Sequence, residues 1–239
     1  MKHVYNTINN DFYLEFQPIV QVSSDENLEE LHFEILLRSR ESNRYPENQL
    51  DSYVSYEEKN AILMNWYTKR LKELCDKYPN YIFNFNIHPI QLVYDSTWRH
   101  LELLQEHCHQ LQIEITEKLI PLDFTYKGGS YKMISYIEEI HSLGYKVSID
   151  DVATGQNTLE LVLKNIDSIS SLKFPLRAFK ELDLDILLLF LDSWHGLAKR
   201  YGKTFIVEGV ENERVAKKLY DRGIVWQQGY YWGKSVELS

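Results

Sequence analysis

A strand-like apolar pattern gives way to a small-residue loop at Val147-Ser148-Ile149-Asp150-Asp151-Val152-Ala153-Thr154-Gly155. Val147 and Ile149 alternate with a serine, as in a half-buried strand, and two adjacent aspartates follow directly. Neighbouring carboxylates repel each other unless a cation lies between them. Taken alone, the pair is more typical of a turn or a helix cap, since aspartate begins many of both. The polar residues that end the other strands decide between these interpretations.

The composition restricts the class of protein. Of 239 residues, 26 are basic and 35 acidic, which gives a net charge of -9. This balance disfavours binding to long nucleic acids, but it allows a small anionic ligand if metal ions supply local positive charge. Cys75 and Cys108 have neither metal-binding nor redox spacing, which suits a reducing cytoplasm. The N-terminus has no signal-like core, and the longest apolar run, 186–191, is too short for a membrane segment, so we expect a cytoplasmic protein.

Apolar alternation and helical spacing predict strands and helices in turn along most of the chain. Strands are expected at 12–22, 31–37, 81–87, 111–116, 145–150, near 172–174, at 204–208 and at 224–228. Helices are expected at 57–78, 98–107, 130–143, 158–165, 179–201 and 211–221. A turn is expected at 25–27 and a loop at 40–51, which contains Pro46. The alternation favours one α/β domain over residues 1–239, with a (β/α) barrel as the first choice and an open doubly wound sheet as the alternative.

A polar residue lies at or near the end of seven of the predicted strands. These residues are Glu34, Asn86, Glu114, Asp150, Lys173, Glu208 and Gln228. In a barrel such positions converge at the C-terminal mouth, where catalytic groups collect. Four carboxylates with an amide oxygen among them suit Mg²⁺ or Mn²⁺, and the lack of histidine or cysteine at these positions disfavours zinc. The pattern therefore predicts a site for hard divalent cations.

The same strand ends lie in segments that resemble the motifs of the EAL domain family, which hydrolyses the second messenger cyclic di-GMP. The segments are Gln17-Pro18-Ile19, Phe33-Glu34-Ile35-Leu36-Leu37-Arg38, Asn86-Ile87-His88-Pro89, Ile113-Glu114-Ile115-Thr116-Glu117, Asp150-Asp151-Val152-Ala153-Thr154-Gly155, Val207-Glu208-Gly209-Val210-Glu211 and Gln228-Gly229-Tyr230-Tyr231. They follow the family order and cover nearly the whole chain. The resemblance implies a TIM-like (β/α)8 barrel whose first strand runs antiparallel to the rest.

The resemblance also implies a role for each matching residue. The implied metal ligands are Glu34, Asn86, Glu114 and Asp150 for one ion, with Asp150 and Asp151 bridging towards a second. Glu208 would be the general base or a second-metal ligand, and Lys173 would orient the attacking water. The other implied residues are Arg38 at a phosphate, Gln17, Leu36 and Gln228 on the substrate side, Glu117 in support of the loop and Glu211 in support of the catalytic site.

The implied activity is metal-dependent hydrolysis of cyclic di-GMP to linear pGpG, with two Mg²⁺ or Mn²⁺ ions. Two such ions can activate a water, hold the leaving oxygen and neutralise phosphoryl charge. Two alternatives stay open. One is a receptor or interaction module that binds the nucleotide or a protein partner without turnover, and the other is a barrel phosphohydrolase with a different substrate. A homodimer and a regulatory protein partner are further expectations from the family.

Besides the neutral change of the final Gly-Lys-Pro to Gly233-Lys234-Ser235, three positions depart from the family pattern. The signature Glu-Ala-Leu reads Glu34-Ile35-Leu36, and Ile35 is expected to face the helices as a packing variant. The usual Phe-Gly after the aspartate pair is Val152-Ala153, which puts regulation or assembly in question. The lysine of Lys173-Phe174-Pro175 falls two residues later than usual, so Ser171 is the alternative occupant of its position. The apolar neighbours of Lys173 favour the lysine.

Overall fold

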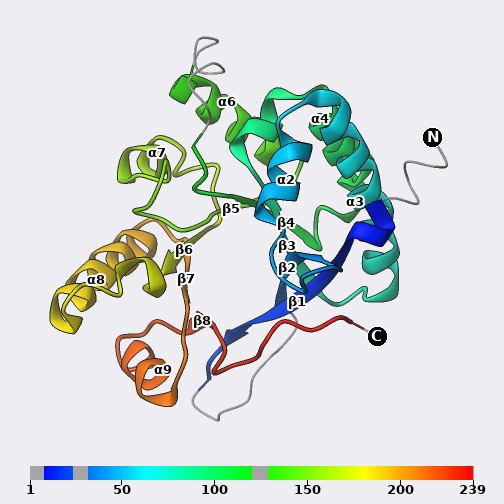
Figure 1. Ribbon diagram of the computed structural model, residues 1–239. Coiled ribbons are helices and arrows are strands. Elements are labelled where there is room, and N and C mark those ends of the chain that lie inside the picture. Colours follow the sequence, from blue (N-terminus) through cyan, green and yellow to red (C-terminus); the bar gives the residue numbers. More distant parts are fainter. Residues whose placement is uncertain (1–7, 24–31, 120–128, 239) are drawn as a thin grey trace.

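The computed structural model describes residues 8–23, 32–119 and 129–238 (Figure 1). The turn expected at 25–27 and the expected start of the second strand at Leu31 lie outside these residues. In the described ranges the strands are β1 (Phe12–Gln21), β2 (His32–Ser39), β3 (Ile82–Ile87), β4 (Leu111–Ile115), β5 (Lys146–Ile149), β6 (Ser171–Pro175), β7 (Thr204–Glu208) and β8 (Trp226–Gln228). They follow the predicted strands closely.

The strands close into a barrel in sequence order, β1 to β8. β1 is antiparallel to both of its neighbours, β2 and β8, whereas every other neighbouring pair is parallel. An antiparallel neighbour needs no helical crossover, which is why the sequence shows no helical pattern between the first two strands. The barrel prediction is confirmed, and the open sheet is excluded.

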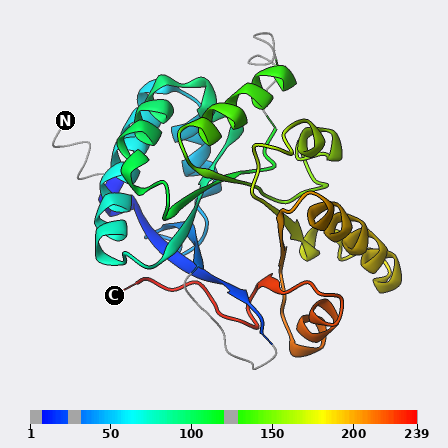
Figure 2. The same ribbon diagram turned by 180° about the vertical axis from the view of Figure 1, so that it is seen from behind.

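Helices surround the strands on the outside of the barrel (Figures 1 and 2). They are α2 (Glu47–Val54), α3 (Glu57–Lys77), α4 (Asp95–Leu103), α6 (Gly129–Ser142), α7 (Leu159–Lys164), α8 (Leu184–Arg200) and α9 (Glu213–Tyr220), with short 3-10 helices at Pro89–Val93, Gln105–His107 and Leu176–Phe179. None of the helices in the described part of the chain is long and apolar enough to cross a membrane.

The loop prediction for 40–51 was wrong over its second half, where α2 begins. Pro46 stands immediately before the helix, a place where the missing N–H of proline costs nothing. Leu50 and Val54, four residues apart, are its two buried side chains. Such a short pattern in a polar stretch carries too little periodicity to identify a helix from sequence. The helix expected to begin at residue 179 starts at Leu184, after the Asp183 side chain caps the Asp185 N–H.

The layer between the strands and the helices differs sharply in polarity from the interior of the barrel. The space between strands and helices is filled by apolar side chains, among them Leu63, Ile115, Phe174 and Val207, all fully buried. The inside of the barrel is polar instead. Below the mouth, it holds the buried side chains of His32, Asn84, Gln112, Ser148 and Ser171, each two residues before a polar residue of the mouth. Side chains alternate along a strand, so each strand presents one residue at the mouth and one below it.

Candidate active site

The Lys173 ammonium lies at the centre of the barrel mouth. Its Nζ is 2.6 Å from Glu208 Oε1, 2.9 Å from Glu114 Oε2, 3.0 Å from Glu34 Oε2 and 3.4 Å from Asp150 Oδ1. The lysine side chain is fully buried. Four strands thus bring carboxylates from distant parts of the sequence to one cation from β6, as the strand-end pattern predicts.

Lys173, and not Ser171, occupies the mouth. Both residues point into the barrel because they are two positions apart on β6, but Ser171 lies one layer lower. In the register with β7, Lys173 pairs with Ile206 and Pro175 with Glu208. The backbone of Lys173 thus lies below that of Glu208, and its long side chain carries the ammonium up to the carboxylates of the mouth.

The mouth carries far more negative than positive charge. Its carboxylates are Glu34, Glu114, Glu117, Asp150, Asp151 and Glu208. Burial, reinforced by the neighbouring charges of Glu34 and Asp150, raises the pKa of Glu114 to about 8. Burial and the charges of Asp150 and Glu117 raise the pKa of Asp151 to about 7. One lysine does not compensate so many carboxylates, so the cluster favours added cations.

For Glu34 and Lys173, the neighbouring charges outweigh burial in setting the direction of the pKa shift. Burial alone would raise the pKa of Glu34, but the Lys173 charge and hydrogen bonds from Gln228 and Asn86 lower it. Burial alone would lower the pKa of Lys173, yet the surrounding carboxylates, led by Asp150 and Glu114, raise it well above its ordinary value. Lys173 stays an ammonium and Glu34 stays a carboxylate.

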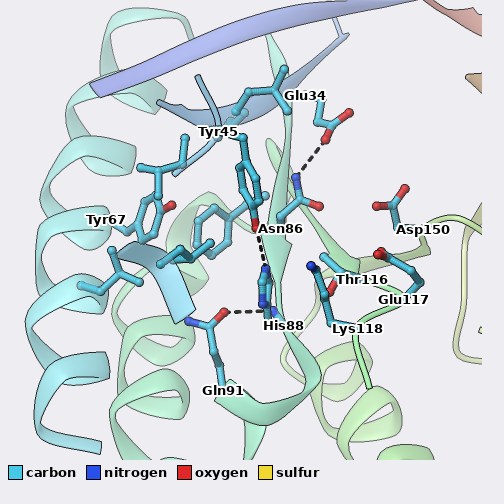
Figure 3. Close-up of a pocket in the computed structure, with 16 residues that line it drawn as sticks. Glu34, Tyr45, Tyr67, Asn86, His88, Gln91, Thr116, Glu117, Lys118 and Asp150 are labelled. Atoms are coloured by element: carbon cyan, nitrogen blue, oxygen red, sulfur yellow. Dashed lines mark hydrogen bonds between the residues drawn. The ribbon is translucent and has the colours of Figure 1, made fainter. Parts of the chain in front are cut away.

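The oxygen atoms at one side of the cluster suit a hard cation. Carboxylate oxygens of Glu117, Asp150 and Asp151 lie within 4.8 Å of one another. Asn86 donates from Nδ2 to Glu34 Oε1 at 2.9 Å and its buried Oδ1 has no hydrogen-bond partner, whereas Asp150 Oδ1 has only the Lys173 ammonium, at 3.4 Å. Figure 3 shows Asn86, Asp150 and Glu117 around the same opening. Buried oxygens without partners, next to excess carboxylate, are what Mg²⁺ or Mn²⁺ coordination would satisfy.

The loop after β5 holds the two aspartates by backbone geometry. Asp151 and Ala153 adopt left-handed φ values of 43° and 68°. Asn157 Nδ2 donates to the carbonyl oxygens of Ile115, at 3.0 Å, and of Asp150. Gly155 packs against Glu117 so closely that an added Cβ would lie 2.1 Å from the Glu117 carbonyl oxygen. The loop and Glu117 are thereby fixed to each other, and the supporting role expected of Glu117 stays a prediction.

The expected substrate-side residues lie at the mouth, but Arg38 is already paired. Gln228 Nε2 donates to Glu34 Oε2 at 2.7 Å and to Gln17 Oε1 at 3.3 Å. Leu36 lines a cavity next to Glu34. Arg38 Nε donates to Glu15 Oε2 at 2.8 Å, and its Nη2 donates to Ser235 Oγ at 3.2 Å. A phosphate at Arg38 would therefore compete with Glu15.

Glu211 is the expected site residue that the structure places outside the cluster. Its side chain is 57% exposed, and Oε1 lies 2.8 Å from Arg177 Nη2. Gly209 precedes it with a φ of 76°, and that turn carries the chain away from the mouth. The structure joins Glu211 to the rim through Arg177.

Two cavities of about 300 Å³ each meet at the carboxylate cluster. Glu34 and Asp150 line both of them. The first, shown in Figure 3, extends past Asn86 towards Tyr45, Tyr67 and His88. The second extends towards Arg177 and Tyr230, whose ring centroid lies 5.1 Å from the guanidinium carbon. The metal-binding candidates thus lie at the junction of the two cavities, where the central part of a ligand that occupies both cavities would lie.

The sequence analysis gave no site role to Tyr45 and His88, which line the first cavity. Tyr45 Oη lies 3.3 Å from His88 Nε2, and burial lowers the pKa of His88 to about 4, so its ring is neutral. His88 lies two residues after Asn86, and residues two apart in a strand point to the same side. This spacing could have identified His88 as a residue that faces the mouth. Tyr45 comes from the stretch expected to be loop, and nothing in its neighbours indicates the contact.

Comparison with known proteins gives the family. Residues 3–235 match the model of the EAL domain. A protein named probable cyclic di-GMP phosphodiesterase PdeN, from Escherichia coli strain K12, is 26% identical over 245 residues, which cover 95% of this chain and 44% of that protein. The chain spans less than half the length of the first curated relatives it matches.

Solved structures share the fold at lower identity. The YkuI protein of Bacillus subtilis, described with an EAL domain in complex with cyclic di-GMP and calcium, has a TM-score of 0.76 and 20% identity, over 99% of this chain and 59% of that one. An EAL domain protein from Listeria monocytogenes EGD-e has a TM-score of 0.74 and 19% identity, over 98% and 93% of the two chains. With the family model matching almost its whole length, this chain belongs to the EAL domain family.

Proposed function

We propose that this EAL domain hydrolyses cyclic di-GMP to linear pGpG with Mg²⁺ or Mn²⁺. The observation that supports it best is the carboxylate cluster at the junction of two cavities. Cyclic di-GMP has two nucleosides on either side of its phosphodiesters, so each cavity would receive one base while a phosphodiester lies at the cluster. The relatives named as cyclic di-GMP phosphodiesterases support the same substrate.

The residues that would hold the metal are Glu34, Asn86, Glu114, Asp150 and Asp151. Glu117 is a further candidate, because its carboxylate lies close to those of Asp150 and Asp151. Bound divalent ions would supply positive charge for the phosphoryl group and lower the pKa of an attacking water. A metal site would also give buried Asn86 Oδ1 a partner that it otherwise lacks, and it would give Asp150 Oδ1 a partner besides Lys173. These oxygen donors match the preference of Mg²⁺ and Mn²⁺.

The protein's own groups would position the water and accept its proton. Lys173 Nζ, 2.6 Å from Glu208 Oε1, would donate a hydrogen bond to a water beside Glu208 once bound cations take over one of its four carboxylate contacts. Burial raises the pKa of Glu208 well above its ordinary value, and bound cations beside it would return it to the carboxylate form that accepts the proton. Gln17 and Gln228 would hold the substrate above the cluster, and Arg38 would contact a phosphate after leaving Glu15.

In the cell, we propose a cytoplasmic domain formed by residues 1–239, since Cys75 and Cys108 are free cysteines, which suits a reducing cytoplasm. A homodimer and a regulatory protein partner remain part of this proposal. They are tested by the oligomeric state in solution and by the change in turnover when a partner is added.

Turnover by the purified chain tests the proposal. With Mg²⁺ or Mn²⁺, cyclic di-GMP should be converted to pGpG, and a chelator should stop the reaction. Glu208→Gln should lower turnover at least about 100-fold because the proton acceptor is lost. Glu73→Gln, at an exposed glutamate of α3, is the matched control and should be unaffected.

Calorimetry separates the enzyme from its alternatives. Metal-independent binding of cyclic di-GMP without any product would instead identify a receptor. Turnover of another cyclic or linear dinucleotide in preference to cyclic di-GMP would identify a different phosphohydrolase.

A further inference from the structure

A second polar cavity opens at the opposite end of the barrel from the mouth. Its volume is about 430 Å³, and we call it the basal cavity. Its lining includes the amino-terminal ends of β2, β4, β5, β6, β7 and β8. The polar residues that matter most are His32, Gln112, Lys146, Ser171 and Lys203. None of them belongs to the two cavities of the mouth.

The inner wall of the basal cavity holds a hydroxyl group without a partner. Ser171 is 3% exposed, lines the cavity, and its Oγ makes no hydrogen bond within the described residues. Barrel interiors of this kind are ordinarily filled by branched apolar side chains. A buried polar atom without a partner is uncommon, and an ordered water or a ligand is the ordinary explanation.

The outer wall of the basal cavity is positively charged. Lys146 begins β5, and Lys203 immediately precedes β7. Asp167 is the one acidic residue among the described lining residues, so the two lysines leave an excess of positive charge. In a chain with a net charge of -9 this local excess stands out. Neither lysine forms an ion pair within the residues that the structure describes.

A simpler interpretation covers only part of this arrangement. The C-terminal ends of α6 and α8 lie next to Lys146 and Lys203 in sequence, and lysines often complement the partial negative charge of a helix C-terminus. That accounts for exposed ammonium groups at the surface. It does not account for an unpartnered serine hydroxyl behind them, in a cavity large enough for several water-sized groups.

We propose that the basal cavity binds a small oxyanion of the phosphate class. Lys146 and Lys203 supply the charge, and the Ser171 hydroxyl donates a hydrogen bond to an anion oxygen. Cations are disfavoured by the two ammonium groups, and an apolar ligand is disfavoured by the polar inner wall. The site is separate from the proposed phosphodiester site and does not depend on its activity.

A hydrogen-bond chain connects the basal cavity to the mouth. His32 Nε2 lies 2.5 Å from Asn84 Oδ1, and Asn84 Nδ2 donates to Glu114 Oε1. Glu114 Oε2 in turn lies 2.9 Å from Lys173 Nζ. This chain crosses the interior of the barrel through buried side chains.

Titration of the metal-free protein with inorganic phosphate, followed by amide NMR, tests the proposal. The expected result is a saturable shift of the Lys146, Ser171 and Lys203 resonances that chloride at equal ionic strength does not reproduce. Lys146→Gln and Lys203→Gln should each weaken the apparent affinity about 10-fold, since a charged hydrogen-bonding contact is lost. Lys59→Gln, at an exposed lysine of α3, should leave it unchanged.

Three results would overturn the proposal. One is the absence of a saturable shift at these residues. Another is equal affinity in Lys146→Gln, Lys203→Gln and Lys59→Gln. The third is a shift that disappears in Arg38→Ala but persists in Lys203→Gln, which would place the phosphate at the mouth. Ser171→Ala, which keeps both lysines, should also weaken binding, and its folding can be checked from the remaining amide spectrum.

Discussion

At the mouth of the barrel, β2, β4 and β5 present Glu34, Glu114 and Asp150, and two positions earlier the same strands present His32, Gln112 and Ser148. The mouth has excess negative charge around Lys173, whereas the basal cavity has excess positive charge from Lys146 and Lys203. Lys146 shares the inward parity of Ser148 on β5 and of Asp150 directly after it, whereas Lys203 lies just before β7. The comparison shows that the two-residue repeat of a strand lets one barrel carry opposite electrostatics at its two ends.

The two ends also differ in how tightly the backbone is held. The loop after β5 combines left-handed residues, side-chain hydrogen bonds to carbonyl groups and a glycine in contact with Glu117. At the base, Gly202 also has a left-handed φ, of 65°, but nothing lies within 4 Å of its missing Cβ. Metal ligands must be positioned within fractions of an ångström, and the additional contacts of the loop after β5 serve that requirement.

Removal of the central cation should have the largest effect. Lys173→Met leaves four contacting carboxylates without their ammonium group in a buried place. Loss of one partner of a buried ion pair costs about 3–5 kcal/mol, so the free energy of unfolding measured with urea in a chelator should fall by that amount. Turnover should fall at least about 100-fold because the water loses its orienting donor.

Lys146→Met is the matched change at the base. The lysine is exposed at the start of β5, so its loss should alter the free energy of unfolding by less than about 0.5 kcal/mol. Equal losses in the two variants would mean that the mouth does not depend on its lysine for stability. The contrast between the two ends would then be wrong.

A glycine at each end gives the next largest effect. Gly155→Ala places a Cβ 2.1 Å from the Glu117 carbonyl oxygen in a residue with φ of 48°, so both a clash and backbone strain arise. We expect a loss of about 2–4 kcal/mol, together with an apparent Mg²⁺ affinity lowered about 10-fold as Glu117 shifts. Gly202→Ala brings strain without a clash and should cost about 1–2 kcal/mol. Urea denaturation and calorimetry measure the two quantities, and a similar cost in both variants would show that the loop yields to the added group.

The strand repeat explains how much of this was predictable. Glu114 and Asp150 each follow an apolar residue at a strand end, so the alternation places them at one mouth, whereas Glu34 is the third residue of β2 and only the closed barrel brings it to the same level. The position of Lys173 followed from its apolar neighbours in the same way. The barrel itself was predictable because strand and helix periods alternate over most of the chain. The catalytic and ligand roles of these residues stay predictions.

What the sequence could not provide are contacts between distant segments. Arg38 meets Ser235 across 197 positions, and Tyr45 meets His88 across 43. Neither contact leaves a periodic signal, because both depend on how loops and the C-terminal segment lie over the barrel. The C-terminal segment pairs with β1 through reciprocal hydrogen bonds between Phe16 and Val236, and only the closed barrel brings these residues together.

A smaller effect is expected at Glu15, whose carboxylate competes with a substrate phosphate for Arg38. Glu15 holds Arg38 at 2.8 Å, and Glu15→Gln would remove the charge that competes with a phosphate. A partly exposed ion pair is worth up to about 1 kcal/mol, so KM for cyclic di-GMP should fall about two- to five-fold with kcat unchanged. Glu73→Gln, which disturbs an exposed pair on α3, is the control. A rise in KM would mean that Glu15 orients Arg38 for the substrate.

The smallest expected effect lies at Ala153, next to the metal-binding candidates. Ala153 has a φ of 68°, a region that costs an L-residue about 1–2 kcal/mol and costs glycine nothing. Glycine also gives the unfolded chain more freedom, which offsets part of the gain, so Ala153→Gly should raise the free energy of unfolding by about 0.5 kcal/mol. Ala61→Gly, in the interior of α3, should lower it by about 1 kcal/mol because no strain is relieved there. Opposite signs in urea denaturation would locate stored strain in the loop beside Asp150 and Asp151, and equal losses would show that the loop carries none.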